Sequence, residues 1–147
     1  MWPVIRSILA VIAGFVAASA VMMAIETANG RLFYPELAKR AEGVTDREVI
    51  RAILASAPVG AMLVVILGWV LGSLAGGFLA GLISPKAPVV HALVLGGLLT
   101  LAGIANNLML PPPLWFWVAT FVVFFPAAYA GVRLAPKKTL ATNSATR

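Results

Sequence analysis

The order of hydrophobic and polar positions divides the chain into four long apolar segments and one long polar segment. The apolar segments cover residues 4–28, 58–83, 89–110 and 114–134. A helix needs about 20 mostly apolar residues to cross a membrane, because the hydrocarbon layer is about 30 Å thick and each residue adds 1.5 Å. All four segments reach that length, and none alternates apolar and polar residues. The pattern therefore predicts an all-α fold, an integral membrane bundle of four transmembrane helices.

The polar segment, residues 30–57, is predicted to be a loop that carries two short helices. Pro35 is suited to begin the first helix and Gly43 to follow its end. Thr45 and Glu48 have the spacing of a capping box, in which each side chain bonds to the other residue's backbone N–H. The residues that follow give the second helix one apolar face: Val49, Ile50, Ile53 and Leu54. We expect this amphipathic helix to lie on the membrane surface or to cap the bundle.

Glycine and proline mark the expected ends of the helices. Asn29 and Gly30 should end the first helix, because both tolerate the left-handed conformation that closes one. Residues 84–88 and the three prolines at 111–113 form the next two connectors, and Pro126 predicts a kink in the fourth segment. Residues 1–135 are thus expected to form a single transmembrane domain, followed by a disordered polar tail over residues 136–147.

The first apolar segment also has features of a secretory signal peptide. Arg6 precedes its apolar run, and Ala18, Ser19 and Ala20 resemble a cleavage site. The apolar run nevertheless continues through Ile25, so that a cleaved chain would begin with an apolar stub. We therefore expect the segment to be retained as a helix.

The composition supports a membrane protein and excludes several other classes. The chain is 61% hydrophobic and 11% charged, whereas soluble domains carry about 25% charged residues. Its net charge of +6 comes from basic residues at the segment ends, with no basic stripe interleaved with aromatics. Membrane lipids are therefore the expected partners and nucleic acid is not. The absence of cysteine excludes thiolate metal sites, and we expect neither a metal nor a cofactor.

The basic residues also give an expected orientation. An even number of spans places both termini on one side, with Arg6, Lys86, Arg133, Lys137, Lys138 and Arg147. The other side would carry Arg31, Lys39, Arg40, Arg47 and Arg51. Since the side richer in Lys and Arg tends to be cytoplasmic, the sequence predicts a multi-pass membrane protein with both termini in the cytoplasm.

Small residues recur at a spacing of four in the second apolar segment. One row contains Gly68, Gly72, Gly76 and Ala80, and a neighbouring row contains Ser73, Gly77 and Gly81. Such rows let helix backbones approach closely in lipid, and this glycine zipper predicts a central position for the second helix. Other segments contribute the helix-packing candidates Gly14, Gly96 and Gly103, and the first has a heptad-like seam through Ala10, Gly14 and Ala17. A packing partner in the same chain is favoured over one in a homo-oligomer or another membrane protein.

Polar residues inside the spans are the candidates for a binding site, because burying them in lipid is costly. Glu26 lies about 33 Å along the first helix from residue 4, and Asn106 and Asn107 lie one turn before the same end of the third. With Asn29 just beyond, these side chains could form one ligand- or ion-binding layer. Alternatively, Glu26 reaches the headgroup water or pairs with Arg31. His91 is expected to be interfacial, and no second His or Cys completes a metal site.

Several elements together resemble a group of small four-helix bacterial inner-membrane proteins for which no activity is established. The elements are Glu26-Thr27-Ala28-Asn29, Tyr34-Pro35, Gly68-Trp69 followed by Gly72 and Gly76-Gly77, and Pro113-Leu114-Trp115-Phe116-Trp117 with Pro126. The resemblance covers roughly residues 5–135 and implies the same membrane fold, without an activity.

The sequence leaves three hypotheses for the function. A non-enzymatic membrane interaction or accessory protein is favoured, because helix-packing signals dominate. A small oligomeric transporter or channel would use Glu26, Asn106 and Asn107. An enzyme acting on a lipid or a quinone is disfavoured, because no paired acid and base groups are present and no catalytic residue is expected.

Overall fold

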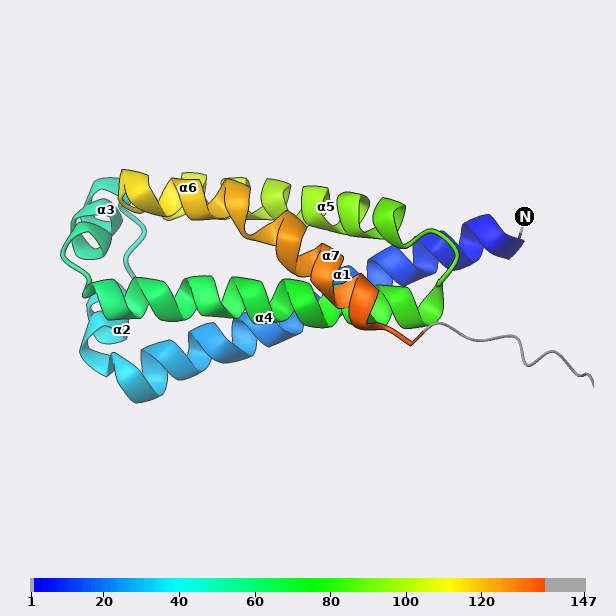
Figure 1. The fold of residues 1–147 in the computed structure, drawn as a ribbon. Helices are drawn as coiled ribbons and strands as arrows, with labels where there is room; N and C mark the ends of the chain where they lie inside the picture. The colour runs from blue at the N-terminus through cyan, green and yellow to red at the C-terminus, as the bar shows by residue number, and fades with distance from the viewer. Residues whose placement is uncertain (1, 137–147) are drawn as a thin grey trace, which may run out of the picture.

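The computed structural model describes residues 2–136, so that residues 137–147 of the expected tail lie outside the described residues. The described chain is helical, without strands. Its elements are α1 (Trp2–Ala28), the π-helical turn η1 (Asn29–Phe33), α2 (Pro35–Ala41), α3 (Arg47–Ala55), α4 (Val59–Ile83), α5 (Pro88–Met109), α6 (Leu114–Val122) and α7 (Phe124–Leu134) (Figure 1). The predicted all-α fold is therefore confirmed.

Four helical segments are long and apolar enough to cross a membrane: Pro3–Phe33, Val59–Ile83, Pro88–Met109 and Leu114–Leu134. The last of these combines α6 and α7. The segments run side by side in alternating directions, and α2 and α3 cover one end of the bundle (Figure 1). We call this the α3 end. The start of α1, the α4–α5 connector and the end of α7 lie at the opposite end, which we call the N-terminal end.

Helix α4 is the central helix, since its most extensive contacts are with α1 on one face and α7 on another. The two rows of small residues divide between these faces. A Cβ atom on Gly72 would lie 2.7 Å from the Ala18 carbonyl oxygen of α1, and one on Gly81 would lie 2.9 Å from the Val132 carbonyl oxygen of α7. Real Cβ atoms do not approach so closely, so both interfaces depend on the missing side chains.

The matching face of α1 differs from the expected heptad seam. Its buried small residues are Ala10, Gly14 and Ala18, at a constant spacing of four, whereas Ala17 is only half-buried. Because the glycines of α4 also recur every four residues, rows of that spacing interdigitate on both helices. The spacing of four between the small residues of α4 therefore requires the same spacing on α1.

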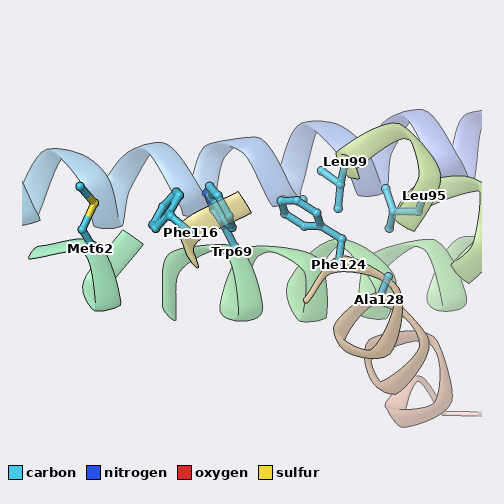
Figure 2. Packing of buried hydrophobic residues seen from close by; sticks show 8 residues of the cluster. Met62, Trp69, Leu95, Leu99, Phe116, Phe124 and Ala128 are labelled. Atoms are coloured by element: carbon cyan, nitrogen blue, oxygen red, sulfur yellow. The ribbon is translucent and has the colours of Figure 1, made fainter. Parts of the chain in front are cut away.

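Large side chains fill the core where α4, α5, α6 and α7 meet (Figure 2). The Trp69 ring packs edge-on against Phe116, with ring centroids 4.8 Å apart. Phe124 lies on the other side of Trp69, at a centroid distance of 5.2 Å. These offset and edge-on arrangements are favoured by aromatic quadrupoles. Leu95, Leu99 and Ala128 continue the core toward the N-terminal end (Figure 2).

The first helix does not end at Asn29 and Gly30, and that prediction is wrong. It continues through η1 to Phe33, where the Tyr34 N–H donates to the Asn29 carbonyl over 2.8 Å. Neither Asn29 nor Gly30 has a positive φ. The helix stops at Tyr34 (φ −134°, ψ 56°), because the ring of Pro35 disfavours the helical conformation of the residue before it. Proline, rather than glycine, therefore sets this end.

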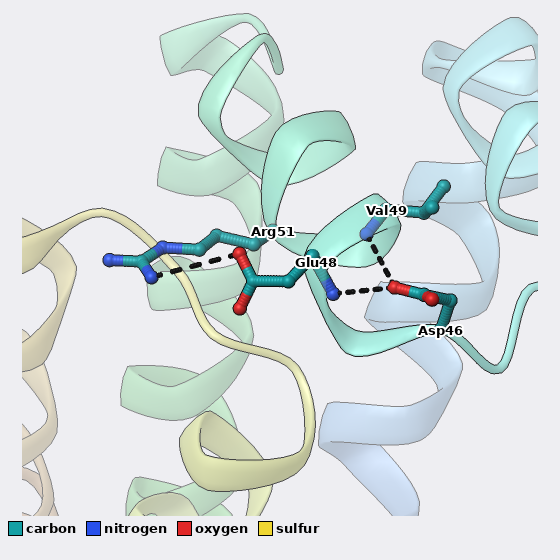
Figure 3. A network of polar contacts seen from close by, with 4 residues as sticks. All are labelled: Asp46, Glu48, Val49 and Arg51. Carbon is teal, nitrogen blue, oxygen red and sulfur yellow. Dashed lines mark hydrogen bonds and ion pairs between the residues drawn. The ribbon is translucent and has the colours of Figure 1, made fainter.

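The N-cap of α3 is Asp46 and not the expected Thr45. One Asp46 carboxylate oxygen accepts from the backbone N–H groups of Glu48, over 2.8 Å, and Val49, over 3.1 Å (Figure 3). Asp is as good an N-cap residue as Ser or Thr. Thr45 and Asp46 were therefore both possible N-caps, and the backbone conformation places Asp46 in that position.

The fourth apolar segment is interrupted where Pro126 predicts a kink. Helix α6 ends at Val122 and α7 begins at Phe124. A proline cannot donate to the carbonyl four residues earlier, and for Pro126 that carbonyl belongs to Val122. The break therefore lies one turn before the proline, and it separates the direction of α7 from that of α6 (Figure 1).

Candidate functional site

A lateral groove of about 210 Å³ lies between α1 and α5 near the α3 end. Its polar residues include Glu26 of α1 and Asn106 of α5, and Trp69 of α4 and Phe124 of α7 also line it. The remaining lining residues are Ser19, Met22, Met23, Leu99, Ala102 and Gly103. We call this the α1–α5 groove. It combines one carboxylate and one amide with a largely apolar lining.

The groove exists because α1 and α5 separate toward the α3 end (Figure 1). Helix α1 packs extensively on α4 but makes few contacts with α5. The glycine row of α4 lets the α1 backbone pack closely against α4. Toward the α3 end, α1 therefore follows α4 and not α5. The space between the two helices therefore opens sideways, toward the region that lipid tails occupy around a membrane-spanning bundle.

Glu26 lies on the α1 wall of this groove, with Trp69 as its neighbour. Both residues line the groove, and the indole N–H is the only donor that the Trp69 side chain has. Trp69 is itself buried, at 3% exposure, so its N–H is fixed by the surrounding packing. The carboxylate keeps further acceptor positions, since an ionised carboxylate offers about four.

Asn106 and Asn107 follow one another on α5 but belong to different sites. Successive residues of a helix project about 100° apart, so that Asn106 lines the α1–α5 groove while Asn107 faces α6. The Asn107 amide donates to the Thr120 hydroxyl over 2.7 Å. Asn107 is only 1% exposed, and its Oδ1 has no hydrogen-bond partner among the described residues. The four candidate side chains are therefore not gathered in a single layer.

Asn29 has a local position between α1 and α4. Its amide donates to the Ala61 carbonyl over 3.0 Å, in the first turn of α4. The residue is buried and does not line the α1–α5 groove. This bond ties the end of the first helical segment to the start of the second, so it helps to position the groove without contacting anything inside it.

His91 is buried, at 2% exposure, in the first turn of α5, so its side chain packs against the protein rather than facing outward. The α4–α5 connector folds over it, and Ser84 of this connector is buried beside it. Within residues 2–136, no three His, Cys, Asp or Glu side chains lie close enough together to hold a metal ion.

Sequence reasoning missed three groups that the tertiary structure brings to these sites. Trp69 stands in the sequence only as part of a pattern, although it lines the groove with Glu26. Thr120, a polar residue in the middle of an apolar segment, was a signal for the partner of Asn107. Arg47 and Arg51, one helical turn apart on α3, line a cavity with Asn107. The spacing of four between the two arginines was visible in the sequence, but their proximity to Asn107 was not.

Comparison of the chain with known protein families, with curated proteins and with solved structures gives no match.

Proposed function

We propose that the chain is a non-enzymatic accessory protein of the bacterial inner membrane that binds a phospholipid with a primary ammonium headgroup in the α1–α5 groove. The observation that carries this proposal is that Glu26 and Asn106 line the same lateral opening between two apolar helices. A ligand that enters from the side of a bundle comes from the bilayer, so a membrane amphiphile fits the opening better than a soluble compound does.

The headgroup chemistry follows from the polar side chains of the groove. Glu26 supplies a carboxylate, and no Lys or Arg is among the residues that line the groove. An ammonium group offers three donors and supplies the missing positive charge, because charge-assisted bonds are about twice as strong as neutral ones. Asn106, with both a donor and an acceptor, suits the adjacent phosphate. Phosphatidylethanolamine carries both groups.

The apolar part of the groove suits the upper part of an acyl chain. Ser19, Met22 and Met23 continue the α1 wall away from Glu26 toward the N-terminal end. Residues 19 and 26 are about 10 Å apart along a helix, so several methylene groups fit below the headgroup. Met side chains adapt to irregular apolar shapes, which suits a flexible chain.

A transport path through the bundle has less support than a binding groove. Below Glu26, the interior between α4, α5 and α7 is filled by Leu95, Leu99, Phe124 and Ala128, each at most 3% exposed. A path for ions or polar solutes requires polar groups or water to replace the hydration shell. The packed apolar interior favours retention of a ligand at the groove.

The orientation that we propose has both termini in the cytoplasm and α2 and α3 outside. Arg6, Lys86 and Arg133 lie at the N-terminal end of the bundle, which agrees with the positive-inside tendency. Reporter fusions at residue 45 and at residue 147 should report opposite sides of the membrane. Reports from the same side would contradict the arrangement of four spans.

The binding proposal is tested with purified, delipidated protein in detergent, by native mass spectrometry during titration with phosphatidylethanolamine. The change Glu26→Gln keeps the side-chain shape but removes the charge, and we expect it to weaken binding about tenfold, as for a loss of about 1.4 kcal/mol. Glu36→Gln is the matched control, because Glu36 is an exposed acid of α2 that pairs with Lys39. It should leave the affinity unchanged.

Two further measurements separate headgroup recognition from a general affinity for lipid. Phosphatidylcholine has a quaternary ammonium without N–H donors, and it should bind wild type and Glu26→Gln equally weakly. Ala102→Phe should fill the groove from its α5 wall and reduce phosphatidylethanolamine binding without a change of charge. Equal affinities of wild type, Glu26→Gln and Ala102→Phe for phosphatidylethanolamine would refute the proposal.

A further inference from the structure

A second cavity, of about 520 Å³, lies at the α3 end beneath α3. Its walls are α3, the proline connector over residues 111–113 and the start of α6, and it is separate from the α1–α5 groove. We call it the α3 cavity. Arg47 and Arg51 of α3 line one side, Trp117 of α6 lines the other, and the floor includes Asn107 of α5.

The two arginines give the cavity a net positive lining. They lie one turn apart on α3, so both side chains leave the same face of the helix. Glu48 also lines the cavity, but it contacts only Arg51, at 4.0 Å, in an exposed pair (Figure 3). Within the described residues, Arg47 has no carboxylate within salt-bridge distance. An Arg guanidinium presents a planar fork of donors that matches a phosphate.

The proline connector supplies no backbone donors to an anion. It consists of three successive prolines, which have carbonyl oxygens but no N–H groups. The positive charge that would hold an anion in the cavity therefore comes from the two arginines on the α3 side. Arg51 extends from α3 toward this connector (Figure 3) and lines the cavity.

The floor of the cavity offers the complementary group, a hydrogen-bond acceptor that has no donor. Asn107 Oδ1 is buried and unpartnered, while the Nδ2 of the same amide is committed to Thr120. An unsatisfied buried acceptor is destabilising, and a ligand that carries a hydroxyl or amine donor would satisfy it. The α3 cavity thus has guanidinium donors at its rim and an amide acceptor at its floor.

From this arrangement we propose that the α3 cavity binds a glycerophosphoryl group, with its phosphate on Arg47 and Arg51 and a glycerol hydroxyl on Asn107. The group is available from two sources, the headgroup of phosphatidylglycerol and free glycerol phosphate. The proposal does not depend on the α1–α5 groove, because the two sites share no lining residue and require headgroups of different charge.

The test uses the full chain in detergent after delipidation, with binding followed by native mass spectrometry. The first probe is phosphatidylglycerol, and phosphatidylmethanol is its matched comparison, since it has the same charge but no hydroxyl donor. Wild type should prefer phosphatidylglycerol several-fold, as one hydrogen bond of about 1 kcal/mol would give. Asn107→Leu should abolish this preference.

The arginines are tested with Arg47→Gln/Arg51→Gln, whose changes lie on exposed positions and leave the packed core intact. This variant should bind both anionic lipids at least tenfold more weakly. Arg40→Gln/Lys39→Gln is the control, because it removes the same charge from α2 at the same end without touching the cavity. An equal loss in the two double variants, or no loss in either, would overturn the proposal.

Free glycerol 3-phosphate is the third probe and identifies the source. A rise in melting temperature on its addition, absent in Arg47→Gln/Arg51→Gln, supports the site with a soluble ligand. Binding of phosphatidylglycerol alone, with the same dependence on the arginines, supports the site with a lipid ligand. If neither probe binds in an arginine-dependent way, the cavity is not a glycerophosphoryl site.

Discussion

The N-terminal end of the bundle is held by direct backbone contact, whereas the α3 end is held by large side chains and connectors with cavities between them. Toward the N-terminal end, Gly76 lies against the Gly14 carbonyl of α1, and Gly77 lies against the Ala128 carbonyl of α7. The cavities found there have volumes of about 130 and 60 Å³. Those toward the α3 end include the α1–α5 groove and the α3 cavity, at about 210 and 520 Å³.

This contrast separates stability from binding within one small bundle. Helices that touch through glycine leave no room for a ligand, because the backbones are already in contact. Where the helices diverge, aromatic rings such as Trp69 and Phe116 bridge the wider spacing and leave hollows beside them. A rigid end that positions a more open end is how ligand sites are commonly supported. Both proposed sites lie at the open end.

The largest expected effect is on the packed end. Gly76→Leu and Gly77→Leu each place a side chain where α1 or α7 now contacts α4, and each should lower the free energy of unfolding by about 3 kcal/mol. Gly97→Leu is the control, since a Cβ atom there would have no neighbour within 4 Å. Thermal unfolding in detergent measures all three. Similar melting temperatures of the Gly77→Leu and Gly97→Leu variants would contradict the distinction between packed and open positions.

A smaller effect is expected at the polar contact between α5 and α6. The bond from Asn107 to Thr120 is buried, and interhelical hydrogen bonds in membranes couple by about 0.6 kcal/mol on average and about 1.7 at most. A double-mutant cycle with Asn107→Leu and Thr120→Val should give a coupling energy in this range. A coupling of zero would mean that Thr120 does not hold the Asn107 amide in the orientation that it has beside the α3 cavity.

The change with the smallest effect on the whole bundle should be one confined to α3. Asp46→Ala removes the N-cap that accepts from Glu48 and Val49, at a cost of about 1 kcal/mol. Because α3 lies outside the four spans, faster amide hydrogen exchange should appear in α3 while the melting temperature of the bundle stays the same. Asp46→Asn retains an acceptor and should exchange like wild type. A uniform change throughout the bundle would show that α3 does not open independently.

Much of the candidate site was visible in the sequence as single residues. Glu26 and Asn106 stand out because polar groups are rare inside apolar spans, and they do line one groove. Asn107 stands out for the same reason but belongs to a different cavity. Helical spacing alone indicated only that two adjacent residues point in different directions. It could not indicate which helix each one would face.

The sequence by itself determined the number of spans, their lengths and the positions of closest packing. These features depend on local composition: hydrophobic length must match the hydrocarbon thickness, and glycine is required wherever two backbones touch. Only the tertiary structure decided which helices are neighbours, that α1 and α5 diverge, and that Arg47, Arg51 and Asn107 share a cavity. The physical reason is that lipid surrounds every apolar helix equally well, so hydrophobicity places helices in the membrane without pairing them. Which helices pack together depends on the shapes of their surfaces. Here it depends on the two faces of α4 on which glycine leaves the backbone uncovered by side chains.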